Sequence, residues 1–139
     1  GGAKRTSCYI DKAAITDKYN AVSHYKIFFT TTYSSDAVIP PEIIKGEINE
    51  ICTETFLVIG PFRTKDEMES CASYMKTKFF RYLLFMGHGT MQVNQSVFSY
   101  IPIVSFKTEW TDDKLYSLFH LYSRDKIAII HLKRPYPIV

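Results

Sequence analysis

The pattern of apolar and polar residues predicts two strands in the first half of the chain. Residues 25–33 (YKIFFTTTY) are mostly β-branched or aromatic, which favours an extended conformation. Ser34-Ser35-Asp36 and Pro40-Pro41 then interrupt the pattern and predict a loop. A second strand is predicted from Ile51 to Ile59, and Gly60-Pro61 is expected to end it.

One long amphipathic helix is predicted after this strand. Thr64 and Glu67 have the spacing of a capping box, and Gly87 is a natural C-terminal stop. Between them, apolar residues recur at helical spacing and form one stripe: Met68, Cys71, Ala72, Met75, Phe79, Tyr82, Leu83 and Met86. The opposite face is expected to carry Tyr74, Thr77, Lys78 and Arg81. Phe80 lies off the stripe and is expected to pack against the strands or another domain.

The C-terminal part predicts one more strand and two short helices. The strand is expected from Val97 to Val104, interrupted by Pro102. The first helix runs from Asp112 to Leu121 behind Thr111 as its N-cap, with inward residues Leu115, Leu118 and Phe119. The second runs from Arg124 to Lys133 behind Ser123, with inward residues Ile127 and Ile130. These elements predict a single α+β domain over residues 1–139. A mixed sheet would pack with one long amphipathic helix and two short C-terminal helices.

Composition narrows the class of protein. The chain has 139 residues, of which 46% are hydrophobic and 22% charged, so it is neither a disordered tail nor a fibrous repeat. No apolar run approaches the length of a membrane helix, so no membrane partner is expected. Cys8, Cys52 and Cys71 lack CxxC spacing, which favours a reducing cytoplasm. Gly1-Gly2 without an initiator Met is typical of a remnant of tag removal, so we expect a fragment of a larger protein.

No catalytic constellation emerges from the residues. The four histidines and three cysteines show no metal-ligand spacing, and both glycine-rich phosphate-binding motifs are absent. The nearest approach to a Mg²⁺ nuclease is Asp36 with Glu42 and Lys45, a spacing that a solvated loop explains equally well. We therefore expect neither catalytic nor metal-binding residues in this chain.

A basic cluster is the better candidate for a binding site, although the net charge is only +3. Lys76, Lys78 and Arg81 lie on the predicted helix and are suited to contact DNA phosphates. Thr90, Gln92 and Asn94 in the following loop carry groups that can read base edges. A solvated helix face followed by a polar surface loop explains the same composition.

Several segments, in order along the chain, resemble one known family. Residues 51–62 (ICTETFLVIGPF) resemble its "CTETYLVIGPF" strand, and residues 76–83 (KTKFFRYL) resemble its "KTKFFRFL" helix. Residues 98–102 (FSYIP) and 109–116 (EWTDDKLY) are similar to "FSFVP" and "WTDEELY", and residues 25–27 to the preceding "KYKV" strand. The family comprises the C-terminal target-recognition region of type II restriction-modification adenine-specific DNA methyltransferases, including fused methylase–endonuclease enzymes.

The resemblance implies a non-catalytic domain that recognises double-stranded DNA in a prokaryotic cytoplasm. S-adenosylmethionine binding and base methylation would belong to an upstream methyltransferase domain of the same chain, so no cofactor is expected here. This chain departs from the family at residues 87–93 (GHGTMQV), where relatives often have a basic stretch with "TQH". That difference bears on which DNA sequence is read. The alternative function is docking within the enzyme or to a subunit, without direct DNA contact.

Overall fold

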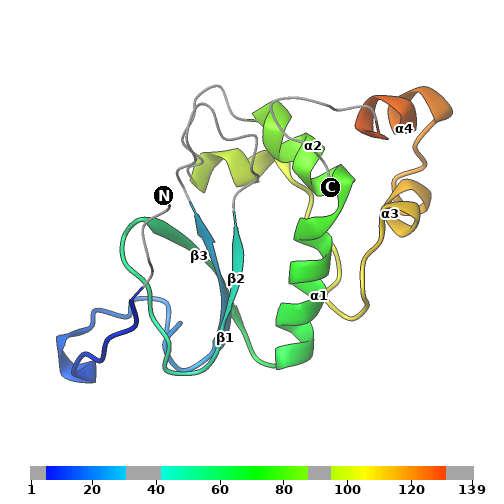
Figure 1. Ribbon diagram of the computed structural model, residues 1–139. Helices are drawn as coiled ribbons and strands as arrows, with labels where there is room; N and C mark the ends of the chain where they lie inside the picture. Colours follow the sequence, from blue (N-terminus) through cyan, green and yellow to red (C-terminus); the bar gives the residue numbers. More distant parts are fainter. Residues whose placement is uncertain (1–5, 31–41, 88–94, 131–139) are drawn as a thin grey trace.

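A three-stranded antiparallel sheet with helices packed against it forms the domain (Figure 1). The computed structural model describes residues 6–30, 42–87 and 95–130. The elements are η1 (Lys12–Ala14), β1 (Tyr25–Thr30), β2 (Ile43–Gly46), β3 (Phe56–Phe62), α1 (Lys65–Lys76), α2 (Lys78–Gly87), η2 (Gln95–Tyr100), α3 (Asp112–Leu118) and α4 (Ser123–Ile130). This arrangement confirms the predicted α+β class.

The sheet has the order β2-β1-β3, so β1 is central and the other two strands form the edges. Phe28 of β1 lies opposite Ile44 of β2 and Val58 of β3. Both pairings are antiparallel, whereas the sequence pointed to a mixed sheet. The strand at residues 43–46 was missed because its segment is short and was interpreted as a loop.

β3 differs from its prediction at both ends. It begins at Phe56 and passes through the Gly60-Pro61 bond, which is cis, to end at Phe62. The register between β1 and β3 shifts near this point, so Gly60 and Pro61 form a bulge in the strand. A bulge accommodates a proline that would otherwise interrupt the ladder, which explains why Gly60-Pro61 does not end the strand.

The predicted long helix is two helices that meet at Thr77. The capping box of Thr64 and Glu67 begins α1 as predicted. Thr77 then leaves the helical conformation, with φ −68° and ψ 154°. Its hydroxyl donates to the Tyr74 carbonyl at 2.7 Å and accepts from the Phe80 N–H at 3.1 Å. Thr77 therefore ends α1 and caps α2, because its side chain satisfies backbone groups of both helices.

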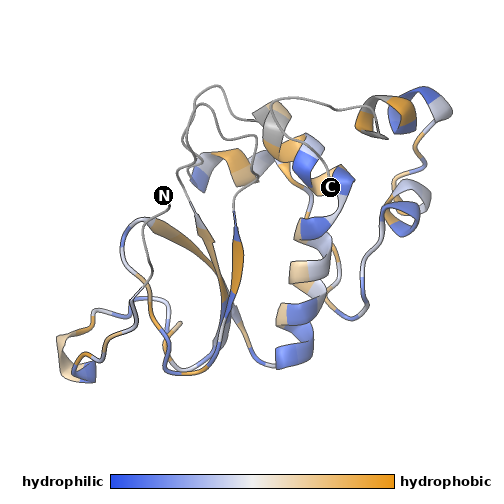
Figure 2. Ribbon diagram, viewed as in Figure 1, coloured by the Kyte–Doolittle hydropathy of each residue, from blue (hydrophilic) through white to orange (hydrophobic). Residues whose placement is uncertain are grey.

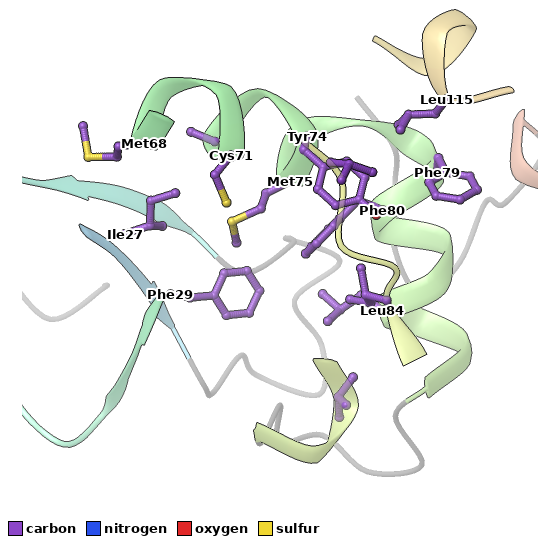
Figure 3. Close-up of a cluster of buried hydrophobic side chains, with 14 of the residues drawn as sticks. Ile27, Phe29, Met68, Cys71, Tyr74, Met75, Phe79, Phe80, Leu84 and Leu115 are labelled. Carbon is purple, nitrogen blue, oxygen red and sulfur yellow. The ribbon is translucent and has the colours of Figure 1, made fainter. Parts of the chain in front are cut away.

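The hydrophobic core lies between α1 and one face of the sheet and continues around α2 (Figure 3). Ile27 and Phe29 point from β1 toward Met68, Cys71 and Met75 of α1. The first turn of α1 is strongly hydrophilic, and the strands are mainly hydrophobic (Figure 2). Phe80 packs inside the domain, edge-on to Tyr74 with the ring centroids 5.1 Å apart.

The segment after residue 94 is helical where a strand was predicted. η2 spans Gln95–Tyr100, and no strand forms in the described residues 95–104. Val97 is the buried residue of η2, and Ile101 and Val104, which follow η2 in irregular structure, are also buried. The strand prediction over residues 97–104 was wrong: the composition favoured a strand, but residues 95–100 form a 3-10 helix and residues 101–104 have no regular secondary structure.

The C-terminal helices are shorter than predicted or begin differently. Thr111 caps α3 as expected, but the helix ends at Leu118, and His120 just beyond it has a positive φ of 51°. The Leu121 N–H donates to the Tyr116 carbonyl at 3.0 Å, the bond that closes a Schellman motif. Tyr122 lies at the N-cap position of α4. Its N–H donates to the Asp125 carboxylate, and its carbonyl accepts from the Lys126 N–H. Ser123 therefore lies inside the helix and is not its cap.

Three apolar side chains predicted to face the core lie at the surface. Met86 is 63% exposed, Leu118 50% and Ile127 56%. Leu115 is fully buried as predicted, and Ile129 of α4 is also buried. All three residues lie within α2, α3 or α4, on faces that the rest of the described domain does not cover.

Candidate nucleic-acid interface

The predicted basic residues lie on both sides of the α1–α2 junction. Lys76 is the last residue of α1 and is exposed, and Lys78 is the first residue of α2 and is half-buried. Arg81 lies three residues farther along α2, so its side chain is a neighbour of Lys78 on the helix surface. Arg81 is also half-buried, and this burial lowers the pKa of its guanidinium.

The three cations at the junction are among the basic groups of the described residues whose side chains have no hydrogen-bond or ion-pair partner. None of the three side chains forms a hydrogen bond or ion pair with another residue of the described segments. By contrast, Lys45 pairs with Glu69, and Lys65 pairs with Glu47 at 2.8 Å. The buried Lys26 ammonium donates to two backbone carbonyls. The junction therefore has charge available for an external anion, as do other exposed cations of the described residues without an internal partner, such as Arg63 and Lys107.

The N-terminus of α2 is already occupied by an internal carboxylate. The N–H groups of Lys78 and Phe79 donate to the Asp112 carboxylate oxygens at 3.1 and 2.9 Å. Asp112 is the first residue of α3, so it joins two helices that are far apart in sequence. Since Thr77 binds the next N–H, an anion at this junction would be held by side chains and not by the helix terminus.

Two residues expected on the polar face are buried. Tyr74 is 3% exposed, and its hydroxyl donates to the Pro102 carbonyl at 2.8 Å. Thr77 is 5% exposed and serves the helix junction. The prediction was wrong because a polar atom on a helix was taken to face solvent. Here the loop after η2 and the helix break supply internal partners.

A groove of about 860 Å³ runs along α1 beside the segment 106–112. Trp110 forms part of its wall, where its N–H donates to Ser73 and its indole N–H donates to the Ser105 carbonyl. Two lysines line the groove, Lys76 and Lys107, against five carboxylates: Asp66, Glu67, Glu69, Glu109 and Asp112. A phosphodiester backbone is disfavoured in a cleft with this charge balance. Lys78 and Arg81 do not line the groove and are better placed than Lys76.

The candidate base-reading residues Thr90, Gln92 and Asn94 lie outside the described residues. In the sequence, residues 88–94 connect the end of α2 at Gly87 to the start of η2 at Gln95. Gln95 is exposed. The prediction for these three side chains therefore stays a prediction.

The nuclease alternative gains no support from the described residues. Glu42 is exposed just before β2, Lys45 is paired with Glu69 of α1, and Asp36 lies outside the described residues. Residues 6–30, 42–87 and 95–130 contain no group of three or more histidine, cysteine or acidic side chains that could hold a metal ion. The three cysteines are free thiols.

The sequence reasoning missed Asp112 as part of the candidate site. Thr111 and Asp112 were interpreted only as the local start of α3, and no local signal connects them with residue 78.

Within the described segments, no helix is both long and apolar enough to cross a bilayer.

The comparisons with known proteins identify no relative of this chain. No protein-family profile matches the chain, and no curated protein or solved structure is significantly similar to it.

Proposed function

We propose that the chain is the DNA target-recognition domain of a type II restriction-modification adenine methyltransferase, in some cases fused to an endonuclease. It binds double-stranded DNA and is not catalytic by itself. S-adenosylmethionine and the methylation chemistry belong to an upstream domain of the same enzyme in a prokaryotic cytoplasm. A recognition domain in such an enzyme holds the duplex while the target base is flipped out of the stack.

The observation that carries this proposal is the coincidence of the resemblance with the unpaired cations. Residues 76–83, which resemble the family's helix, contain Lys76, Lys78 and Arg81. A half-buried arginine without a protein partner has lost hydration that a phosphate can replace with charge-assisted hydrogen bonds. Lys78 and Arg81 therefore supply the leading phosphate contacts.

The other segments of the resemblance support the same proposal, because they pack against this junction. Phe98 of the FSYIP segment lies 6.4 Å from Phe80, measured between ring centroids. Trp110 of the EWTDDKLY segment lies 6.4 Å from Tyr74, and Asp112 binds the start of α2. The segments that resemble the family thus form the packing around the helix junction. Residues 88–94, which contain most of the divergent stretch, connect two helical elements, α2 and η2.

Fluorescence anisotropy with a labelled duplex, at several salt concentrations, tests the proposal. A variant with Lys76, Lys78 and Arg81 replaced by alanine removes the proposed phosphate-binding groups. A variant with Lys18, Lys107 and Arg124 replaced by alanine removes the same charge from three exposed positions elsewhere. We expect salt-sensitive binding by the wild type and the control. In the first variant the affinity drops, and the slope of log K against log salt falls by about 0.9 for each phosphate that is no longer neutralised.

The single variants sharpen the test. Lys78→Ala and Arg81→Ala should each weaken binding more than Lys76→Ala, because Lys76 also lines the carboxylate-rich groove. Equal loss from the two triple variants would show that only net charge matters, and would contradict a site at the helix junction. No binding by the wild type at low salt would favour the alternative, a docking domain without direct DNA contact.

A further inference from the structure

One face of α2 is left uncovered by the rest of the described domain. Among the described side chains of this helix, the buried ones form its inner face and are Phe79, Phe80 and Leu84 (Figure 3). Lys78, Tyr82 and Met86 follow one another at steps of four residues, so they form one row on the other side of the helix. Lys78 and Tyr82 are half-buried, and Met86 is 63% exposed.

This row changes from charged to apolar along the helix. Its N-terminal end is Lys78, with Arg81 beside it, and its C-terminal end is the flexible, polarisable thioether of Met86. The segment Lys78–Gly87 contains no acidic residue. The outer face of α2 therefore favours a partner that is anionic near the first turn of the helix and apolar near the last turn.

We propose that Met86 contacts the 5-methyl group of a thymine in the major groove of the bound duplex and so contributes to sequence specificity. The inference rests on the proposed function and adds a base contact to it. Thymine presents a methyl group in the major groove, and an apolar side chain is a usual way to read it. A duplex that contains a target adenine also contains a thymine opposite to it, so the group is available at such a site.

The dimensions of α2 agree with this placement. Met86 follows Lys78 by eight residues and Arg81 by five, so it lies about 12 Å and about 7.5 Å farther along the helix axis. The major groove is about 12 Å wide and admits an α-helix. With Lys78 and Arg81 on phosphates at the edge of the groove, Met86 is within reach of the base edges. The predicted base-reading segment 88–94 follows Met86 directly in the sequence.

Thymine replacement in a selected duplex tests the contact. The wild-type chain first selects a duplex from a random library, and each thymine is then replaced singly by 2′-deoxyuridine, which lacks only the methyl group. We expect one thymine whose replacement weakens wild-type binding about fourfold, the effect of one buried carbon group. The same replacement should not weaken binding by Met86→Ala. Leu118→Ala is the matched control, because Leu118 is 50% exposed on α3, and it should respond as the wild type does.

The outcomes separate this inference from the proposed function. A wild type that binds no duplex at low salt would refute both, and would leave an acidic protein as the partner for the cations of α2. A wild type that enriches no sequence, or that is insensitive to every thymine replacement, would refute the Met86 contact alone. So would a Met86→Ala variant that is as sensitive as the wild type. In each of these cases the phosphate contacts of Lys78 and Arg81 would stand.

Photocrosslinking gives a second readout that does not depend on a variant. A selected duplex with 5-iodouracil in place of the sensitive thymine carries iodine where the methyl group stood. Irradiation should join this base to Met86 or to Tyr82 of the same row, and tandem mass spectrometry identifies the residue. A crosslink to a residue outside α2 would place the thymine elsewhere on the chain and overturn the proposal.

Discussion

Asp112 stabilises the junction of α1 and α2 from a distance of more than 30 residues along the chain. Its two carboxylate oxygens each accept one backbone N–H, from Lys78 at 3.1 Å and Phe79 at 2.9 Å. Asp112→Ala leaves both N–H groups, which lie in a half-buried region, without this partner. Replacing a helix cap costs about 0.5–2 kcal/mol, and one hydrogen bond to a charged group contributes about 1.5–3 kcal/mol.

Because these contributions overlap, we expect Asp112→Ala to lower the free energy of unfolding by about 2–3 kcal/mol. Asp112→Asn retains one acceptor oxygen and loses the charge at the helix terminus, so its loss should be about half as large. Urea denaturation followed by circular dichroism measures both changes. The slope of the unfolding free energy against urea concentration should be unchanged if the unfolded state is the same.

Asp113→Ala is the matched control. Asp113 is the next residue in the first turn of α3 and is exposed, and it has no hydrogen bond to α2 among the described residues. Its replacement should change the stability by no more than about 0.5 kcal/mol. If Asp112→Ala and Asp113→Ala have the same small effect, the hydrogen bonds from α2 to Asp112 do not contribute to the stability as argued. Faster amide exchange at Lys78 and Phe79 in Asp112→Ala alone would confirm the local cause.

Two further predictions concern the interior. A Cβ at Gly46 would lie 2.8 Å from the ring of Phe28, so Gly46→Ala should destabilise the fold by about 1–3 kcal/mol in thermal or urea unfolding. A Phe28→Leu background should reduce that cost, and an unchanged cost would contradict the steric reason. Burial raises the pKa of the Cys71 thiol from 9.0 to about 12. The unfolded chain then loses this proton first as pH rises above 9, and Cys71 should lower stability by up to about 1.4 kcal/mol per pH unit. Urea unfolding between pH 8 and 10.5 should show a shallower decline for Cys71→Ala than for the wild type, and parallel curves would refute the assignment.

The candidate site shows where sequence reasoning was sufficient and where it was not. The basic residues at 76, 78 and 81 could be proposed from sequence, since their spacing and charge are local properties. The interpretation of Tyr74 and Thr77 as part of the same polar face was wrong, because Pro102 and the helix break take up their hydroxyl groups. The carboxylate-rich groove beside Lys76 is lined by residues of both α1 and the segment 106–112. Neither segment alone predicts it.

The sequence by itself determined the features that depend on neighbours along the chain. The capping box at Thr64, the N-cap at Thr111, the strand at residues 25–30 and the α+β class all follow from local hydrogen bonding and side-chain patterns. Tertiary structure decided where the long helix breaks and which strands form the edges of the sheet. At Thr77 the apolar stripe would have continued a helix. The break is held by Asp112, whose carboxylate satisfies N–H groups that an unbroken helix would bond internally. The position of β3 at an edge of the sheet likewise depends on contacts between segments far apart in sequence and not on the residues of β3 alone.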